Sequence, residues 1–362
     1  MASVVESTKI GSPAPRQASN AHRGRGKVRA FDYTLRAFDD TRWLRRPKGR
    51  KWVSRTGYRP QLPERIRMTD KANIQGDLFT FDSPLMSGVQ GERSLMAFPF
   101  FALAKTAWTK PLIYKTDLVS IEIGPGPKGI ATIYDKEILL YIASLMVAKI
   151  DDGQPVSQDF YFTANDLFRV TGVNSSSRSY TRLSDALERL QGTQIKTDIE
   201  AGGEGESGFF SWLESAKLHY TKNKYGERRL KSVRVRLCDW LFRAILRDRH
   251  VLEYAPAYFQ LGPVERRLYE VARSSCVDGP KTTTLEELRL QLGYQSAARQ
   301  FKVILKGVIE NNTIPGFTFS IEKPAPIAGV ASRKVDAEIV RIVPNANASR
   351  AAGHRPTDRV IT

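Results

Sequence analysis

The sequence predicts an α+β fold in which one structural unit occurs twice. An amphipathic helix leads to a second, capped helix, then to a turn with a glycine, a third helix with basic and polar residues, and β-strands. This order extends from about Asp135 to Leu237 and again from about Pro263 to Val343. It is typical of a helix-turn-helix followed by a wing, so we expect two tandem winged-helix (helix-turn-helix) domains. The formal net charge of +18 favours a polyanionic partner for them.

Length and composition bound the domain organisation. The 362 residues suffice for two or three domains, and a hydrophobic content of 41% with 17 Phe is that of a globular protein. We expect a basic amino-terminal arm and linker at 1–90, a first winged-helix domain at 91–250, a second at 251–345, and a disordered tail at 346–362.

The amino-terminal arm is a separate compositional zone. Its first 60 residues hold 15 Lys and Arg against four acids, and prolines and glycines interrupt any periodicity, so we expect it to be largely disordered. Two interpretations stay open. The arm is either a solvated tail or a basic extension that adds contacts to phosphate groups.

Ahead of the first unit, strands are expected at 118–123 and 130–134, joined by a turn rich in glycine and proline. The turn resembles a phosphate-binding loop only superficially. Pro125 and Pro127 lack the backbone N–H groups that such a loop needs, and no Ser or Thr follows Lys128. We interpret the segment as a hairpin turn.

In the first unit we expect a helix at 136–149 capped by Asp135. Thr163 begins a second helix with a capping-box pattern, and Gly172 ends it. The third helix, Ser177–Leu190, carries one apolar stripe. The stripe consists of Leu183, Ala186, Leu187 and Leu190. The strands that follow are expected at 194–199, 209–221 and 228–237, with a hairpin turn at 222–226.

The second unit repeats these signals. Pro263 suits the first turn of its first helix, Thr284 begins a second helix with another capping box, and Gly293 ends it. The stripe of its third helix consists of Phe301, Ile304, Leu305, Val308 and Ile309. Its strands are expected at 317–322 and 337–343.

The predicted DNA-binding residues lie on the two third helices and on the hairpin of the first unit. A groove-reading helix must pack one face on its own domain and present long donors on the other. In the first unit these residues are Ser175, Ser176, Ser177, Arg178, Tyr180, Arg182 and Arg189. In the second unit they are Gln295, Ser296, Arg299, Gln300, Lys302 and Lys306. The alternative is that both are ordinary solvated helix faces.

The hairpin after the first unit is the predicted wing. Its basic residues would straddle a DNA backbone or enter a minor groove, and the alternative is an edge strand protected by charge. These residues are Lys222, Lys224, Arg228, Arg229 and Lys231. A weaker equivalent in the second unit consists of Lys323, Arg333 and Lys334.

Catalytic, metal and cofactor sites find little support. The two cysteines, Cys238 and Cys276, form no metal-binding pattern, and the four histidines are isolated from one another. We therefore expect no enzyme, no catalytic residue, no metal and no cofactor. No signal peptide or membrane span is recognisable, and we expect a cytoplasmic protein.

Three short segments resemble the replication initiator protein A family of bacterial plasmids. They are Phe98-Pro-Phe-Phe-Ala-Leu-Ala-Lys105, Ile121-Glu-Ile-Gly-Pro-Gly126 and Ala131-Thr-Ile-Tyr-Asp135. The resemblance covers roughly residues 95–345. It implies an initiator that binds repeated double-stranded DNA sites at an origin, helps to open the duplex, recruits the host's replication initiator and helicase, and forms homodimers that repress its own promoter.

Several other functions remain as alternatives. A transcriptional repressor without initiator activity would use the same fold. An endonuclease or nicking enzyme would cleave origin DNA with Mg²⁺, and a partitioning protein would spread along DNA beyond the repeats. The resemblance favours the initiator, whereas the duplicated unit by itself indicates only a DNA-binding fold.

Overall fold

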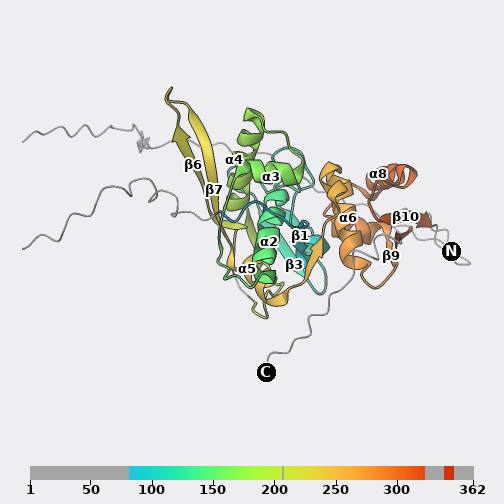
Figure 1. The fold of residues 1–362 in the computed structure, drawn as a ribbon. Helices are drawn as coiled ribbons and strands as arrows, with labels where there is room; N and C mark the ends of the chain where they lie inside the picture. The colour runs from blue at the N-terminus through green and yellow to red at the C-terminus, as the bar shows by residue number, and fades with distance from the viewer. Residues whose placement is uncertain (1–80, 206–207, 323–337, 346–362) are drawn as a thin grey trace, which may run out of the picture. The chain divides into compact units, whose positions relative to one another are not determined.

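The structure is a computed structural model, and it describes residues 81–205, 208–322 and 338–345 (Figure 1). It contains both helices and antiparallel sheets, in keeping with the predicted α+β class. The predictions for residues 1–80 of the amino-terminal arm, for the carboxyl-terminal tail and for the loop with Lys323, Arg333 and Lys334 lie outside the described residues. None of the helices in the described ranges is both long and apolar enough to cross a membrane.

The three helices of the first unit form as predicted, and we call them the first helix triplet. They are α2 (Lys136–Asp151), α3 (Ala164–Thr171) and α4 (Ser177–Gly192). The Thr163 hydroxyl accepts the backbone N–H of Asp166 at 3.2 Å and so begins α3. Gly172, at φ 70°, ends α3 in the left-handed region that glycine tolerates best.

Asp135 does not cap α2, so this prediction was wrong. Its backbone is already helical, and its side chain forms no cap hydrogen bond. The carboxylate instead accepts the backbone N–H of Thr132 at 2.7 Å and both donors of an arginine on α4. These bonds occupy the oxygens that a cap would use.

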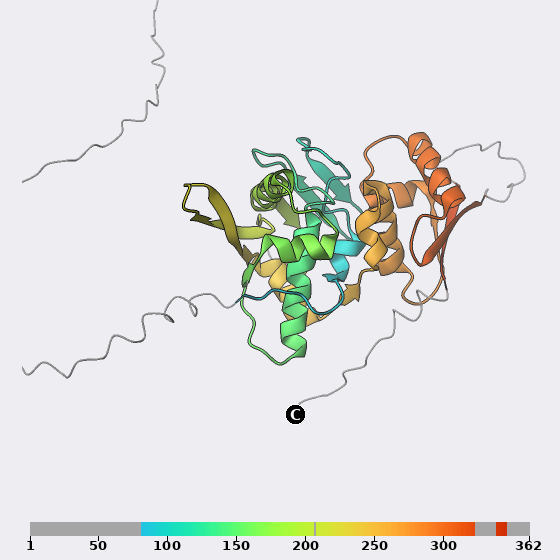
Figure 2. The ribbon, with the colours of Figure 1, turned by 45° about the horizontal axis from the view of Figure 1, so that its top comes forward.

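A three-stranded antiparallel sheet combines one strand from between α2 and α3 with two strands that follow α4. Its order is β4 (Asp159–Phe162), β7 (Arg228–Leu237) and β6 (Leu213–Lys222). The hairpin of β6 and β7 forms at the predicted place, whereas β4 was not anticipated. Figures 1 and 2 both show the turn end of this β6–β7 hairpin pointing away from the helices.

The strands of a second sheet flank the first helix triplet in sequence, since two of them precede α2 and the third follows α4. Its order is β2 (Leu112–Lys115), β3 (Ser120–Gly124) and β5 (Gln194–Thr197). The prediction of a strand at 130–134 was wrong, because β3 pairs with β2 and β5 instead. The backbone of Ile130 bonds to Trp108, and that of Ala131 bonds to Thr193 and Ala102, so no continuous ladder forms.

The second helix triplet also forms as predicted. It consists of α6 (Pro263–Ser275), α7 (Leu285–Leu292) and α8 (Ala298–Asn311). The capping box is reciprocal, because the Thr284 hydroxyl accepts the N–H of Glu287 at 3.1 Å and the Glu287 carboxylate accepts that of Thr284 at 3.0 Å. Gly293, at φ 73°, ends α7.

The second triplet has its own antiparallel sheet. Its order is β10 (Phe317–Glu322), β11 (Ile339–Pro344) and β9 (Lys281–Thr284). The strand β9 was not anticipated, since four polar residues carry no apolar alternation. Figure 2 shows this sheet in orange to red beside the helices of the same colour range.

Two hydrophobic cores lie within the described residues, and one short helix contributes to both. The connecting elements are β1 (Gln90–Glu92), α1 (Arg93–Ala97), α5 (Asp239–Arg243), η1 (Ala244–Asp248), β8 (Val251–Glu253) and η2 (Pro256–Gln260). On α1, Leu95 belongs to the core of the first helix triplet, and its neighbour Met96 belongs to the core of the second. Leu140 of α2 also enters the second core.

Candidate nucleic-acid interface

Helix α4 has the two faces that a groove-reading helix needs. Its predicted apolar stripe is buried, with Leu190 fully covered. Arg178 and Arg182 are exposed, four residues apart and therefore on the same side of the helix. Neither guanidinium forms an ion pair or hydrogen bond with another described residue. Both are free to meet a ligand.

The turn before α4 is exposed and internally bonded. The Ser176 hydroxyl caps the helix by accepting the N–H of Ser179 at 3.3 Å, and the Ser179 hydroxyl donates to the Asn174 carbonyl at 2.6 Å. The Ser175 hydroxyl lies 3.3 Å from the Asn165 side-chain oxygen. The predicted serines, Ser177 included, thus lie at the amino-terminal end of α4, where the helix dipole favours an anion.

Two predicted contacts of the first unit have structural partners instead. The Tyr180 hydroxyl donates to Asn165 at 2.9 Å, and its ring packs edge-on against Phe168 of α3. The Arg189 guanidinium donates to both oxygens of Asp135, at 2.7 and 2.8 Å, and this bidentate bond raises the arginine pKa. These residues hold α4 against α3 and α2, and we remove them from the exposed set.

The cations of the β6–β7 hairpin are neutralised at its base and unpaired toward its turn. At the base, Arg234 and Arg236 share Asp159, and Arg236 also pairs with Glu214. Toward the turn, the exposed cations form no ion pair with another described residue. They are the five predicted residues Lys222, Lys224, Arg228, Arg229 and Lys231. Lys217 lies opposite Arg234 nearer the base, and it is also exposed without an ion pair to another described residue.

The turn of the hairpin is a bonded structure organised by Asn223. Its side-chain oxygen accepts the N–H groups of Tyr225 and Glu227, each at 2.9 Å, and its amide donates to the Glu227 carboxylate at 2.7 Å. Gly226 takes φ 81°, which the turn requires. The turn's acidic group is therefore engaged, and the surrounding charge is positive.

Helix α8 repeats the arrangement of α4. Phe301 and Leu305 are fully buried. The predicted residues on its other side, Arg299, Gln300 and Lys306, are exposed, and so are Gln295 and Ser296 in the turn before it. Lys302 differs, because its ammonium pairs with Glu338 beside β11 and is largely covered. We therefore remove Lys302 from the exposed set.

The structure adds residues that the sequence interpretation missed. Thr181 on α4 and Val303 on α8 lie on the exposed sides, and Val303 is 69% exposed. Counting three and four residues from Arg178 and Arg299 would have found both positions. Lys217 on β6 could have been found only through the register of the hairpin, which pairs it with Arg234.

No three His, Cys, Asp or Glu side chains in the described ranges lie close enough together to hold a metal ion. The arrangement consists of exposed cations, amides and hydroxyls on helix faces and on a hairpin. Such groups bind phosphate oxygens and base edges, because they are hydrogen-bond donors of complementary charge.

Two known structures match the course of this chain with TM-scores below 0.5. Domains 2 and 3 of RctB match at a TM-score of 0.48 with 16% identity, covering 68% of this chain and 94% of that one. The Pi initiator protein, solved in complex with iteron DNA, matches at 0.41 with 14% identity, covering 60% and 92%. With TM-scores below 0.5, neither likeness establishes a shared fold.

Sequence comparison gives a stronger result. A protein of Wigglesworthia glossinidia brevipalpis, named provisionally as a replication protein, is 32% identical over 246 residues, which are 67% of this chain and 88% of the relative. Residues 90–319 match the sequence profile of replication initiator protein A. The resemblance found in the three short segments is thereby confirmed, and the chain belongs to the replication initiator protein A family.

Proposed function

We propose that this protein is a plasmid replication initiator that acts in the cytoplasm by binding repeated double-stranded DNA sites at an origin. In this proposal, each helix triplet with its sheet is a winged-helix unit, and α4 and α8 are the recognition helices. One observation carries it: both helices bury one side and expose unpaired long donors on the other. Membership of the family supports the same reading.

The exposed residues divide by the part of DNA that they suit. Arg178, Arg182 and Arg299 have the forked donors that match guanine, and Gln300 has the amide that matches adenine. The cations of the β6–β7 hairpin suit phosphate groups, which position a protein without reading sequence. Duplex opening would follow from binding energy spent on deforming the DNA. The proposed action consists of binding and includes no catalytic step.

The proposal also covers partners. Recruitment of the host replication initiator and helicase, and repression by a homodimer, are what the family implies. Co-precipitation of the host proteins with origin-bound initiator tests the first. Comparing promoter output with and without the protein tests the second.

Quantitative gel shifts on the DNA that flanks the gene test the proposed site. Arg178→Ala/Arg182→Ala and Arg299→Ala/Lys306→Ala are each expected to weaken specific binding by at least about tenfold, since a good bidentate base contact contributes about 1–3 kcal/mol. Lys110→Ala/Lys115→Ala is the control, because it removes two exposed charges from β2 and the loop before it. Equal affinity of all these variants and the wild type would refute the placement of the site.

Plasmid maintenance separates an initiator from a repressor. A plasmid that carries only this gene and its flanking DNA as origin should be maintained, and the Arg178→Ala/Arg182→Ala variant should be lost. Specific DNA binding without maintenance would favour the repressor. Relaxation of supercoiled origin DNA in Mg²⁺ would instead favour a nicking enzyme.

A further inference from the structure

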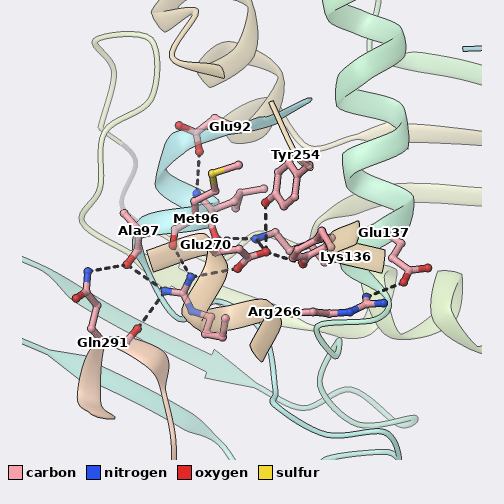
Figure 3. A network of polar contacts seen from close by, with 12 residues as sticks. Glu92, Met96, Ala97, Lys136, Glu137, Tyr254, Arg266, Glu270 and Gln291 are labelled. Carbon is pink, nitrogen blue, oxygen red and sulfur yellow. Dashed lines mark hydrogen bonds and ion pairs between the residues drawn. The ribbon is translucent and has the colours of Figure 1, made fainter. Parts of the chain in front are cut away.

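A buried network of charged side chains joins the two helix triplets (Figure 3). Lys136, at the start of α2, lies on the side of the first triplet. Arg267 and Glu270 lie on α6 of the second. Lys136 and Glu270 are fully buried and Arg267 is 1% exposed. Charges are rarely buried so completely unless they are paired, so the arrangement of their partners is informative.

The carboxylate of Glu270 is the centre of the network. One oxygen accepts Lys136 Nζ at 2.7 Å and the hydroxyls of Tyr258 at 2.7 Å and Tyr254 at 3.2 Å. The other oxygen accepts Arg267 Nη1 at 3.1 Å. Lys136 Nζ also donates to the Leu95 carbonyl at 2.8 Å. The single carboxylate of Glu270 therefore pairs with two cations, Lys136 from the first triplet and Arg267 from its own helix.

Arg267 extends the network to α1 and α7. Its guanidinium donates to the carbonyls of Met96 and Ala97 on α1, the latter at 3.0 Å. It also donates to the Gln291 carbonyl near the end of α7 at 3.0 Å. One side chain of α6 thus fixes the short helix that contributes to both cores.

A second ion pair joins α2 and α6, and we call the buried contact between these two helices the junction. In this pair the anion lies on α2 and the cation on α6. Glu137 of α2 accepts Arg266 Nη1 of α6 at 2.6 Å, and the Arg266 guanidinium stacks 4.4 Å from the centre of the Tyr134 ring. On α2 the cation Lys136 thus faces the anion Glu270, and the neighbouring anion Glu137 faces the cation Arg266. Displacing α2 along α6 in one direction would bring Lys136 toward Arg266, and displacing it in the other would bring Glu137 toward Glu270, so like charges oppose either displacement.

The start of α2 also bonds to α4, the proposed recognition helix of the first unit. Asp135 directly precedes Lys136 and holds Arg189 of α4 through two hydrogen bonds. Three consecutive charged residues, Asp135, Lys136 and Glu137, thus bind α4 on one side and α6 on the other. On α6, buried Leu268 and Val271 share the second core with Phe301 of α8. A continuous path of contacts links α4 to α8.

We propose that Asp135, Lys136 and Glu137, with Arg266, Arg267 and Glu270, are positioning residues that set the spacing between the DNA segments read by α4 and α8. This inference rests on the proposed function. Buried ion pairs contribute little net stability compared with apolar replacements of similar size, but they penalise other arrangements. Replacing the central pair by apolar residues should therefore leave a folded protein that no longer enforces one spacing.

The test measures affinity for DNA in which the two half-sites are moved apart. Footprinting first defines the half-sites, and duplexes are then made with the natural spacing and with one or two base pairs added or removed. Each added base pair displaces a half-site by about 3.4 Å along the axis. The wild type should lose at least about tenfold affinity at an altered spacing, the size of one to two lost base contacts.

The variants are Lys136→Met/Glu270→Leu and, as a milder change, Glu137→Gln/Arg266→Gln. We expect folded proteins, by circular dichroism, that bind each isolated half-site like the wild type but lose less than about threefold at an altered spacing. Lys115→Met/Glu122→Leu makes the same chemical change in an exposed pair between β2 and β3, and it should keep the wild-type profile.

The outcomes separate the two claims. If the wild type binds neither half-site, the proposed function is refuted. If both half-sites bind and either folded junction variant keeps the wild-type spacing profile, only the positioning role is refuted. The milder variant serves if the buried double variant does not fold, because Glu137 lies at the margin of the junction with 15% of its side chain exposed.

Discussion

Val303 is an apolar side chain on the exposed side of a helix whose neighbours there are Arg299, Gln300 and Lys306. It is 69% exposed, and valine gains nothing from water at such a position. The methyl group of thymine is the apolar feature of the major groove. A valine that reads this methyl group would explain its place among polar residues.

Replacing thymine by uracil in the DNA repeats tests this interpretation. We expect the wild type to bind the uracil duplex about three- to fourfold more weakly, since one buried methylene-sized group contributes about 0.8 kcal/mol. Val303→Ser should bind both duplexes equally. Ile113→Ser, which alters an exposed apolar residue on β2, should discriminate like the wild type. Equal wild-type affinity for the two duplexes would contradict the contact.

Both cysteines are buried, as expected of small apolar residues, and both are free thiols. Burial raises the pKa of Cys238 to about 12 and that of Cys276 above its ordinary value. Since the thiolate is the reactive form, neither should react with a thiol reagent such as DTNB at pH 8 in the folded protein. Two equivalents should react in denaturant, and prompt reaction without denaturant would contradict the burial.

At the scale of the element, local signals predicted what is locally determined. Thr163, Gly172, Thr284 and Gly293 fix the ends of α3 and α7 through bonds within a few residues, so their positions followed from spacing. The strands β4 and β9 did not, because four residues become a strand only through distant partners on β7 and β11. For the same reason 130–134 was wrongly expected to be a strand.

For the candidate site, too, the sequence predicts the features that are set locally and misses those that depend on distant residues. Which side of α4 and α8 is exposed could be predicted, because helical periodicity is local. Which cations on those helices are free could not. Arg189 and Lys302 find Asp135 and Glu338, partners that lie on other elements and leave no signal in the helix itself.

The unpaired cations of the β6–β7 hairpin lead to a prediction about how DNA affinity depends on salt concentration. If these cations contact phosphates, Lys222→Gln/Lys224→Gln should reduce the slope of log affinity against log salt by up to about two, since each contact contributes about 0.9. Lys110→Gln/Lys115→Gln removes the same charge from β2 and the loop before it, and it should leave the slope nearly unchanged. The measurement is a salt titration of anisotropy. Equal slopes for both variants would favour a hairpin that is merely protected by charge.

On the scale of the whole molecule, the junction determines how much stability the protein loses when one of its charged residues is replaced. Glu270→Leu would leave Lys136 and Arg267 buried without their anion, and such a break costs about 3–5 kcal/mol. Adding Lys136→Met removes one of the two stranded charges, while Arg267 keeps its carbonyl acceptors. Urea unfolding should therefore show the double variant to be more stable than Glu270→Leu. A double variant less stable than the single one would mean that the pair acts through packing instead.

The adjacent residues Leu95 and Met96 enter different cores, and this limits how the chain can be divided. A carboxyl-terminal fragment beginning at Pro263 would lack Met96, Leu140 and Lys136, one of the two cations that pair with Glu270. It would expose an apolar opening and leave the Glu270 carboxylate with Arg267 as its remaining described ion-pair partner. Limited proteolysis between β8 and α6 should therefore release no autonomous half, and the described part of the chain should melt in one cooperative step.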